Sequence, residues 1–193
     1  MVGRRVIGAV LAGGAGRRIG GDKAVVELQG RPLLLYPLAA ARMALDQVVV
    51  VAKADTILPP LDPEIAVWIE DDEPRHPLTG ICQALRSARG AAVVVVAGDM
   101  PFVSRDLLRT LARARMAGAA ALVPRAAGRL QPLCARYEAA ALGDLSDLEE
   151  DVALTDAVAA LRPRILEWPD DGPFFNVNHP EDLLHAAALL DGR

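Results

Sequence analysis

Residues 11–23 read LAGGAGRRIGGDK, and the fold of this chain follows from that stretch. It comes directly after a short apolar run at residues 6–10, VIGAV, which predicts a first buried strand. Glycines let a backbone turn sharply and present bare N–H groups to a ligand. The basic side chains of Arg17, Arg18 and Lys23 in the same stretch suit phosphate. The sequence therefore predicts a polyphosphate-binding loop at the end of the first strand.

This loop matches neither of the two common phosphate-binding templates. Lys23 is followed by Ala24, so the motif G-x-x-x-x-G-K-[ST] is absent. The arginines and the second glycine pair leave no clean helix start, which a dinucleotide-binding fingerprint requires. The alternative interpretation is a plain glycine-rich loop with a solvated basic face.

Length and charge limit the classes of protein that fit. The chain has 193 residues, which is enough for one sizeable core, so we expect a single domain over residues 1–193. A net charge of −4 does not indicate a nucleic-acid-binding protein, since such proteins are typically basic. No apolar run approaches the roughly 18 residues that a membrane span needs.

The cysteines and the N-terminal residues predict a cytoplasmic protein. Cys82 and Cys134 have no metal-binding spacing and form no disulfide framework, so packed free thiols are expected. The apolar run after Arg4 and Arg5 is too short for a signal peptide. Together these features predict a cytosolic, reducing location.

Strand and helix patterns alternate along the chain. Strands are expected at residues 47–52, 65–69, 91–97 and 119–123, and helices at residues 32–43, 77–88 and 104–117. Such alternation implies right-handed β-α-β units, and therefore an α/β fold with a mostly parallel sheet flanked by helices. The last third is less regular, with an extended segment at 128–137, helices at 137–143, 152–161 and 180–190, and a strand at 164–167. We expect a nucleotide-binding part over residues 1–125 and a substrate-side cap over residues 126–193.

Two acids follow predicted strands, at the sheet edge where ligands bind in such folds. Asp99 follows the most continuous apolar run, and a carboxylate there can hold a divalent metal against phosphate oxygens. The alternative for Asp99 is an acid near the start of the helix that Ser104 begins. Asp71 also lies at a strand end, but inside an acidic run at residues 70–73, and such runs are often simply solvated.

The residues 11–23 resemble the nucleotidyltransferase signature LAGG-x-x-x-R-x-G-x-DK, with Arg18, Gly20, Asp22 and Lys23 in its fixed places. Four further segments resemble motifs of one family, in the same order along the whole chain: HPLTG at residues 76–80, GDMPF at 98–102, QPL at 131–133 and FNVNHPEDL at 175–183. In this combination the sequence resembles the molybdenum cofactor guanylyltransferases.

The resemblance implies a Rossmann-like nucleotidyltransferase fold and a reaction. GMP would pass from GTP to molybdenum-bearing molybdopterin, giving the guanine dinucleotide cofactor and pyrophosphate. It also implies roles for residues at matching positions: backbone groups of Leu11, Ala12, Gly13 and Gly14 would hold the nucleotide, Lys23 and Arg18 would neutralise its phosphates, Asp71 would help bind guanine nucleotide, and Asp99 would bind Mg²⁺. Asn176, Asn178 and Gln131 are candidates for the pterin side of the site, with turn and helix-cap roles as the alternative for the two asparagines.

The chemistry of such a transfer agrees with these roles. The terminal phosphate of the pterin attacks the α-phosphorus in line, so positioning and charge neutralisation carry the step. The attacking phosphate is already ionised near neutral pH, and no general base is required. The expected partners are GTP and molybdopterin as substrates, with transient contact to a protein that loads molybdopterin or to a molybdoenzyme.

Two positions depart from the family pattern. His76 stands where the family's GPLxG loop begins with glycine, and Val51 stands where members often carry an asparagine that touches the nucleotide. Both changes bear on the choice of base. A cytidylyltransferase for the same pterin, or a nucleotidyltransferase for another phosphorylated small molecule, therefore remains open. A different class is a non-catalytic domain that senses nucleotide or hands over the cofactor.

Overall fold

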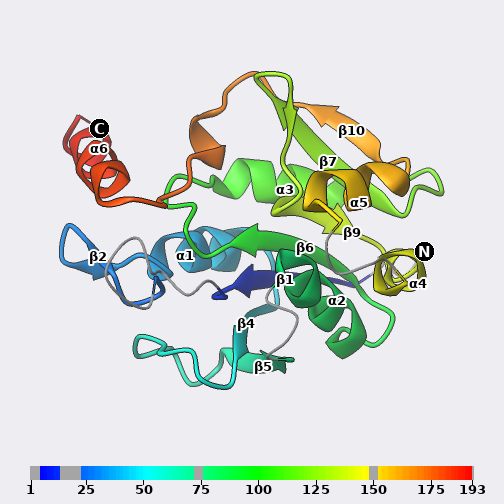
Figure 1. Cartoon of the computed structure of the whole chain (residues 1–193), viewed down its shortest axis with the longest axis horizontal. Coiled ribbons are helices and arrows are strands. Elements are labelled where there is room, and N and C mark those ends of the chain that lie inside the picture. Colours follow the sequence, from blue (N-terminus) through cyan, green and yellow to red (C-terminus); the bar gives the residue numbers. More distant parts are fainter. Residues whose placement is uncertain (1–4, 14–22, 72–75, 148–151, 193) are drawn as a thin grey trace.

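The computed structural model describes residues 5–13, 23–71, 76–147 and 152–192, and its centre is one large sheet (Figure 1). The strands lie in the order β10-β7-β9-β6-β1-β4-β5, and β8 pairs with β7. Their bounds are β1 Val6–Leu11, β4 Val48–Lys53, β5 Ala66–Glu70, β6 Ala92–Ala97, β7 Ala121–Ala126, β8 Arg129–Leu130, β9 Cys134–Tyr137 and β10 Arg164–Glu167. Strands β6, β1, β4 and β5 run parallel, whereas β9 is antiparallel to both of its neighbours. The predicted α/β class with a mostly parallel sheet is confirmed.

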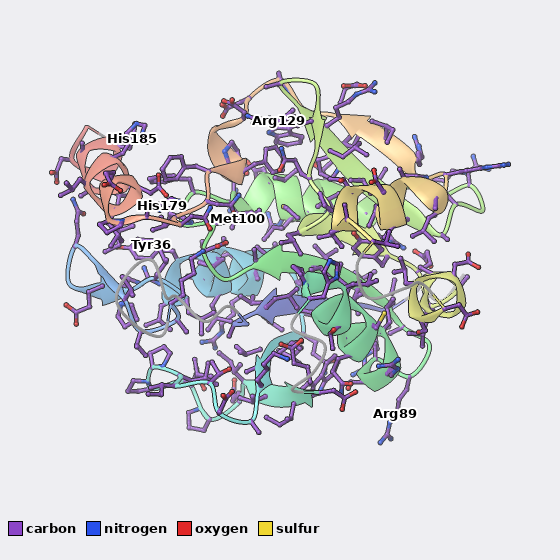
Figure 2. All side chains as sticks on the ribbon, viewed as in Figure 1. Tyr36, Arg89, Met100, Arg129, His179 and His185 are labelled. Carbon is purple, nitrogen blue, oxygen red and sulfur yellow. The ribbon has the colours of Figure 1, made fainter. Side chains whose placement is uncertain are left out.

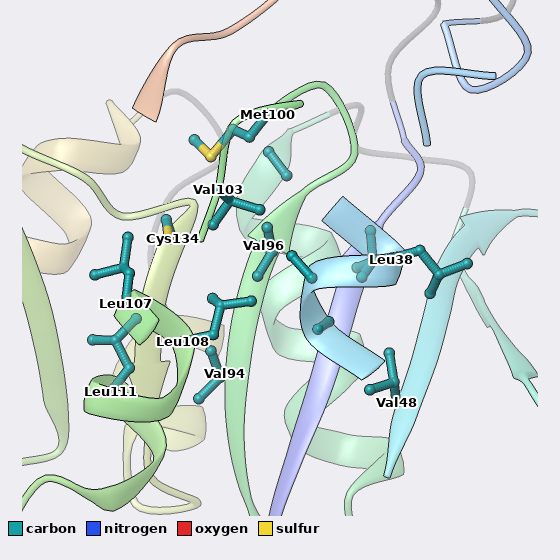
Figure 3. Close-up of a cluster of buried hydrophobic side chains, with 14 of the residues drawn as sticks. Leu38, Val48, Val94, Val96, Met100, Val103, Leu107, Leu108, Leu111 and Cys134 are labelled. Atoms are coloured by element: carbon teal, nitrogen blue, oxygen red, sulfur yellow. The ribbon is translucent and has the colours of Figure 1, made fainter. Parts of the chain in front are cut away.

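Helices cover both faces of this sheet because each strand buries alternate residues on opposite sides. Helices α1 (Leu35–Ala44) and α3 (Arg105–Arg113) cover one face. Figure 3 shows that cluster, with Leu38 of α1 and Leu107, Leu108 and Leu111 of α3 on the same face of the sheet as Val94 and Val96 of β6. Helices α2 (Pro77–Ser87), α4 (Ala141–Ser146) and α5 (Leu154–Ala160) cover the other face. None of the described helices is long and apolar enough to cross a bilayer.

The last helix packs against a hairpin from the first part of the chain. Helix α6 (Pro180–Asp191) lies beside a small hairpin made of β2 (Glu27–Leu28) and β3 (Arg31–Pro32), at one end of the molecule (Figure 1). A separate apolar cluster joins them, formed by Leu28, Leu33, Phe102, Val177 and Ala186. Figure 2 draws His179 and Met100 where the segment before α6 meets the loop after β6. The C-terminal segment is thereby fixed next to the loops that follow the central strands.

Several predicted boundaries differ from the structure, each for a local reason. The helix expected at residues 32–43 begins at Leu35, because Pro32 belongs to β3. Pro37 then falls in the first turn, where an N–H would have no helical partner. The helix expected at residues 104–117 ends at Arg113. The helix expected at residues 137–143 is wrong at its start, because Tyr137 is buried in β9 and the helix begins only at Ala141.

The cysteines are packed free thiols, as expected. Both Cys82 and Cys134 are buried and unpaired. Burial raises the pKa of the Cys82 thiol and raises the pKa of Cys134 to about 12. Neither side chain therefore carries a reactive thiolate near neutral pH.

Residues after 126 belong to the same sheet as the residues before them. Strand β9 lies inside the sheet, between β6 and β7, and β10 forms its outer edge. The division into a nucleotide-binding part (1–125) and a substrate-side cap (126–193) stays a prediction about function.

Candidate active site

A cavity of about 500 Å³ lies along the carboxyl ends of β6, β1, β4 and β5. It is lined from each of these strand ends and from the start of α2. The lining residues include Leu11, Ala12, Gly13, Lys23, Lys53, Glu70, His76, Gly80, Gly98, Asp99, Leu133 and Asn178. The loops at this edge, far apart in sequence, therefore face one shared space.

Lys23 is the centre of a polar cluster on the β6 side of this cavity. Its Nζ forms an ion pair with Oδ2 of Asp99 and donates to Oδ1 of Asn178 over 2.8 Å. The side chains of Lys23 and Asp99 are only 15% and 18% exposed. A carboxylate and an amide oxygen thus hold the Lys23 ammonium group at a fixed place in the cavity wall, where it can contact a phosphate.

The second carboxylate oxygen of Asp99 is a candidate metal ligand. Oδ1 is buried and has no hydrogen-bond partner among the described residues. A buried carboxylate oxygen without a hydrogen bond costs free energy unless a ligand or a cation contacts it. The described residues contain no group of three or more acidic, histidine or cysteine side chains that could hold a metal alone. Mg²⁺ is commonly bound by one or two carboxylates together with substrate phosphates, so Asp99 fits that mode.

Hydrogen bonds to the neighbouring strands hold the backbone after β1 at the edge of the cavity. The N–H of Gly98 donates to the carbonyl of Leu11 over 2.9 Å, and the N–H of Ala12 donates to the carbonyl of Val51 over 2.8 Å. A Cβ on Gly98 would lie 2.8 Å from the Leu11 oxygen, so only glycine permits this approach of the two loops. These contacts fix Leu11, Ala12 and Gly13 at the edge of the cavity.

A second charged pair, Lys53 and Glu70, lies at the other end of the cavity. Their side chains are 12% and 7% exposed, and Lys53 Nζ lies 3.9 Å from Glu70 Oε1. The Nζ of Lys53 also donates to the carbonyl of Asp71 over 2.5 Å. Sequence reasoning missed both side chains and chose the next acid, Asp71. The period-two alternation of β5 could have found Glu70, because it shares a face with Trp68, which packs toward α2.

The structure shows where the two residues that depart from the family pattern, His76 and Val51, lie relative to the cavity. His76 is the N-cap of α2, and its Nδ1 accepts the N–H of Leu78 over 3.2 Å while its side chain borders the cavity. Val51 is buried in the apolar cluster that faces α2, and it does not line the cavity. The cap therefore accounts for a histidine at position 76, and Val51 presents only its carbonyl to the neighbouring loop.

The predicted site residues fall into three groups. Leu11, Ala12, Gly13, Lys23, Asp99 and Asn178 line the same cavity. Gly14, Arg18 and the neighbouring Arg17 lie outside the described residues. Asp71, Gln131 and Asn176 do not line the cavity: Asp71 is exposed, the backbone N–H of Gln131 donates to Pro124, and the Asn176 amide donates to the Phe174 carbonyl over 3.1 Å. The binding roles of all these residues stay predictions.

Comparison with known proteins places the chain in a family. Residues 8–165 match the model of the MobA-like NTP transferase domain. A molybdenum cofactor guanylyltransferase of Cereibacter sphaeroides is 35% identical, over 96% of this chain and 97% of that protein. A probable molybdenum cofactor guanylyltransferase of Thermococcus gammatolerans is 36% identical, over 92% and 97%.

A solved structure agrees with this placement. The molybdopterin-guanine dinucleotide biosynthesis protein A of Archaeoglobus fulgidus is 28% identical, with a TM-score of 0.77 over 97% of this chain and all of that one. A match over 97% of the chain covers most of the residues after β7, which include the segment that brings Asn178 to Lys23. The chain belongs to the family of the MobA-like NTP transferase domain.

Proposed function

We propose that this nucleotidyltransferase transfers GMP from GTP to molybdenum-bearing molybdopterin, giving molybdopterin guanine dinucleotide and pyrophosphate. The observation that carries the transfer chemistry is the Lys23–Asp99 pair, with its buried second carboxylate oxygen, at the end of the central strands. The near full-length similarity to relatives named molybdenum cofactor guanylyltransferase supports GTP and molybdopterin as the substrates.

In this proposal the protein positions charges and does no covalent chemistry itself. An oxygen of the pterin's terminal phosphate forms a bond to the α-phosphorus of GTP, and the bond between the α-phosphorus and the bridging oxygen breaks. Pyrophosphate leaves with that electron pair. Lys23, held by Asp99 and Asn178, neutralises phosphate charge, and the backbone at Ala12 and Gly13 approaches the nucleotide from the edge of the cavity. Mg²⁺ bound at Asp99 would supply further charge neutralisation at the phosphates.

The test is to incubate the protein with molybdenum-bearing molybdopterin, Mg²⁺ and each labelled nucleoside triphosphate, and to identify the dinucleotide. We expect the guanine dinucleotide with stoichiometric pyrophosphate. A cytosine dinucleotide as the main product would overturn the guanine assignment and establish the cytidylyltransferase alternative. Nucleotide binding without any dinucleotide would indicate a domain that senses nucleotide or hands over cofactor.

A cytoplasmic location and transient contact with a protein that loads molybdopterin, or with a molybdoenzyme, belong to the same proposal. The contact follows from a product that another protein must receive. Cross-linking in cells with the cofactor pathway active is expected to trap such a partner, whereas crosslinks to the chain itself alone would contradict it.

A further inference from the structure

We propose that Lys23 is the counter-ion of Asp99 in the protein without nucleotide, and that it has to leave this carboxylate before a divalent cation can bind there. The phosphates of the nucleotide attract Lys23 away from Asp99. The inference rests on the proposed nucleotidyl transfer, and it makes metal binding at Asp99 depend on nucleotide.

The two carboxylate oxygens of Asp99 have different surroundings. Oδ2 is paired with the Lys23 ammonium, and Oδ1 is buried without a hydrogen-bond partner among the described residues. The side chain as a whole is 18% exposed, so its open part is not Oδ1. A cation in the cavity therefore has to replace Lys23 at Oδ2, or the carboxylate has to turn and bring Oδ1 forward. Either change breaks the pair that Lys23 makes with Oδ2.

The balance of charge also disfavours a cation at this pair. Lys23 neutralises Asp99, and the described part of the chain contains no group of three acidic, histidine or cysteine side chains that would add ligands. Mg²⁺ dehydrates reluctantly and is usually bound by one or two carboxylates together with substrate phosphates. A single, neutralised carboxylate is therefore a poor metal site until phosphates add negative charge and oxygen ligands.

Asn178 gives the ammonium a second partner that remains when Asp99 is released. An ammonium has three donors, and two of those on Lys23 meet Oδ2 of Asp99 and Oδ1 of Asn178. A phosphate oxygen can accept the third before the pair with Asp99 breaks, so the charge keeps a partner throughout. The hydrogen bond from the Val177 N–H to the Asp99 carbonyl holds Asn178 beside this loop during the exchange.

The presence of lysine, rather than arginine, at position 23 supports such an exchange. The chain has 21 lysines and arginines, of which only Lys23 and Lys53 are lysine, and both line the cavity. An arginine can hold a carboxylate through two parallel hydrogen bonds, whereas an ammonium is a compact charge on a flexible stem. The protein therefore has the more easily released cation where Asp99 has to change partners.

The test uses Mn²⁺ as the metal probe and measures its binding to the protein without nucleotide by electron paramagnetic resonance. In Lys23→Met we expect Mn²⁺ to bind about tenfold more tightly than in the wild type, because the loss of one charge-assisted contact releases Asp99. Asp99→Asn alone is expected to leave this binding unchanged, because Lys23 already neutralises the carboxylate in the wild type. In the double variant the gain should disappear, which places it at Asp99.

Two further variants control for the change of charge. Arg89→Gln removes one positive charge from an exposed turn before β6, at the edge of the sheet opposite to the cavity, and should leave Mn²⁺ binding unchanged. Lys23→Arg keeps the charge beside Asp99 and should bind Mn²⁺ as weakly as the wild type. Circular dichroism checks the fold of each variant.

A second measurement on the wild type decides the question if Lys23→Met does not fold. Because the chain has two lysines, ¹⁵N labelling of lysine gives two ammonium signals in nuclear magnetic resonance, which Lys53→Arg assigns. GTP in the presence of EDTA is expected to shift the Lys23 signal. Mg²⁺ alone, at the concentration used for turnover, is expected to leave that signal in place.

The outcomes distinguish this inference from the proposed function. Unchanged Mn²⁺ binding in Lys23→Met, or weaker binding in Asp99→Asn alone, overturns the inference, and so does a Lys23 signal that shifts with Mg²⁺ alone. The proposed function stands in each of these cases as long as the wild type forms the guanine dinucleotide. Absence of that product overturns the proposed function, whereas the metal measurements decide the inference by themselves.

Discussion

The main-chain N–H of Val177 donates to the main-chain carbonyl of Asp99 over 3.0 Å. This bond ties the segment before α6 to the loop after β6, although the two lie far apart in sequence. Val177 is fully buried in the apolar cluster that α6 shares with the β2–β3 hairpin. The packing of the last helix therefore sets the position of Asn178 beside Lys23, and the C-terminal segment is part of the site.

Asn178→Ala is expected to raise the KM for GTP about three- to tenfold with little change in kcat. Its Oδ1 is one of the two groups that orient the Lys23 ammonium, and a hydrogen bond to a charged group contributes about 1.5–3 kcal/mol before solvent screening. Steady-state kinetics of pyrophosphate release measure the change. Unaltered kinetics would mean that Asn178 serves only the turn.

Asn176→Ala gives the comparison within the same segment. Its amide donates to the Phe174 carbonyl, so a variant that loses thermal stability and keeps its kinetics supports a turn role. A raised KM for the pterin, with the KM for GTP unchanged, instead supports the predicted contact with the pterin.

Asp99→Asn is expected to lower kcat by at least about 100-fold, the usual effect of removing one preorganised charge at a reacting phosphate. The amide can still accept from Lys23, but it replaces the carboxylate whose Oδ1 is left for a cation. Pyrophosphate release at increasing Mg²⁺ concentration measures the effect. Circular dichroism checks the fold, and full turnover with normal Mg²⁺ dependence would refute the metal role.

Gly98→Ala should damage both stability and activity. Its Cβ would lie 2.8 Å from the Leu11 carbonyl oxygen, so the β1 and β6 loops must separate at the nucleotide site. We expect a loss of about 1–3 kcal/mol in the free energy of unfolding in urea. Gly143→Ala in α4 is the matched control, because its Cβ meets nothing within 4 Å. That change should stabilise by about 0.5–1 kcal/mol, and equal destabilisation by both changes would contradict the argument.

Asp182 makes the stability of α6 depend on pH. Hydrogen bonds from the backbone N–H groups of Asn178 and His179 lower the pKa of this carboxyl below its usual value of 3.8. A depressed folded-state pKa contributes stability that is present above the unfolded pKa and is lost as pH falls through the folded one. Asp182→Asn should therefore cost about 0.5–2 kcal/mol at pH 7.

Urea unfolding of wild type and Asp182→Asn at a series of pH values measures this dependence. The difference between them should shrink only below about pH 4, where the carboxyl begins to protonate. Glu181→Gln, at the neighbouring exposed acid of the same turn, serves as the control for a simple change of charge. A difference that stays constant down to pH 3 would contradict the linkage.

The central half of the sheet and one end of the site were predictable from local pattern. The apolar run of β6 and the rule that ligands bind at strand ends together located Asp99 and the loop after β1. Asn178 was a candidate from resemblance alone, because its contact with Lys23 joins residues that only the packing of α6 brings together.

Other features depend on contacts that no local pattern contains. The pairing of Lys53 with Glu70 requires the register of β4 against β5. The extended segment expected at residues 128–137 contains β9, but local pattern did not predict its place between β6 and β7. In the structure Arg136 is buried, lies 2.6 Å from Glu138 and donates to carbonyls at the end of α3. A buried, paired arginine inside a four-residue strand is visible only once its partners are known.

The position of β9 also governs the order in which the molecule can be completed during synthesis. Residues up to Ala126 emerge from the ribosome first, but β7 has no direct partner in β6 and joins the parallel strands only through β9. Until Cys134–Tyr137 have been translated, β6 presents an open edge of unpaired N–H and C=O groups. Its six residues are all buried in the finished protein. A nascent chain stalled near residue 126 is therefore expected to be prone to aggregation and to need chaperone protection. Synthesis of about a dozen more residues should allow β9 to cover the open edge of β6.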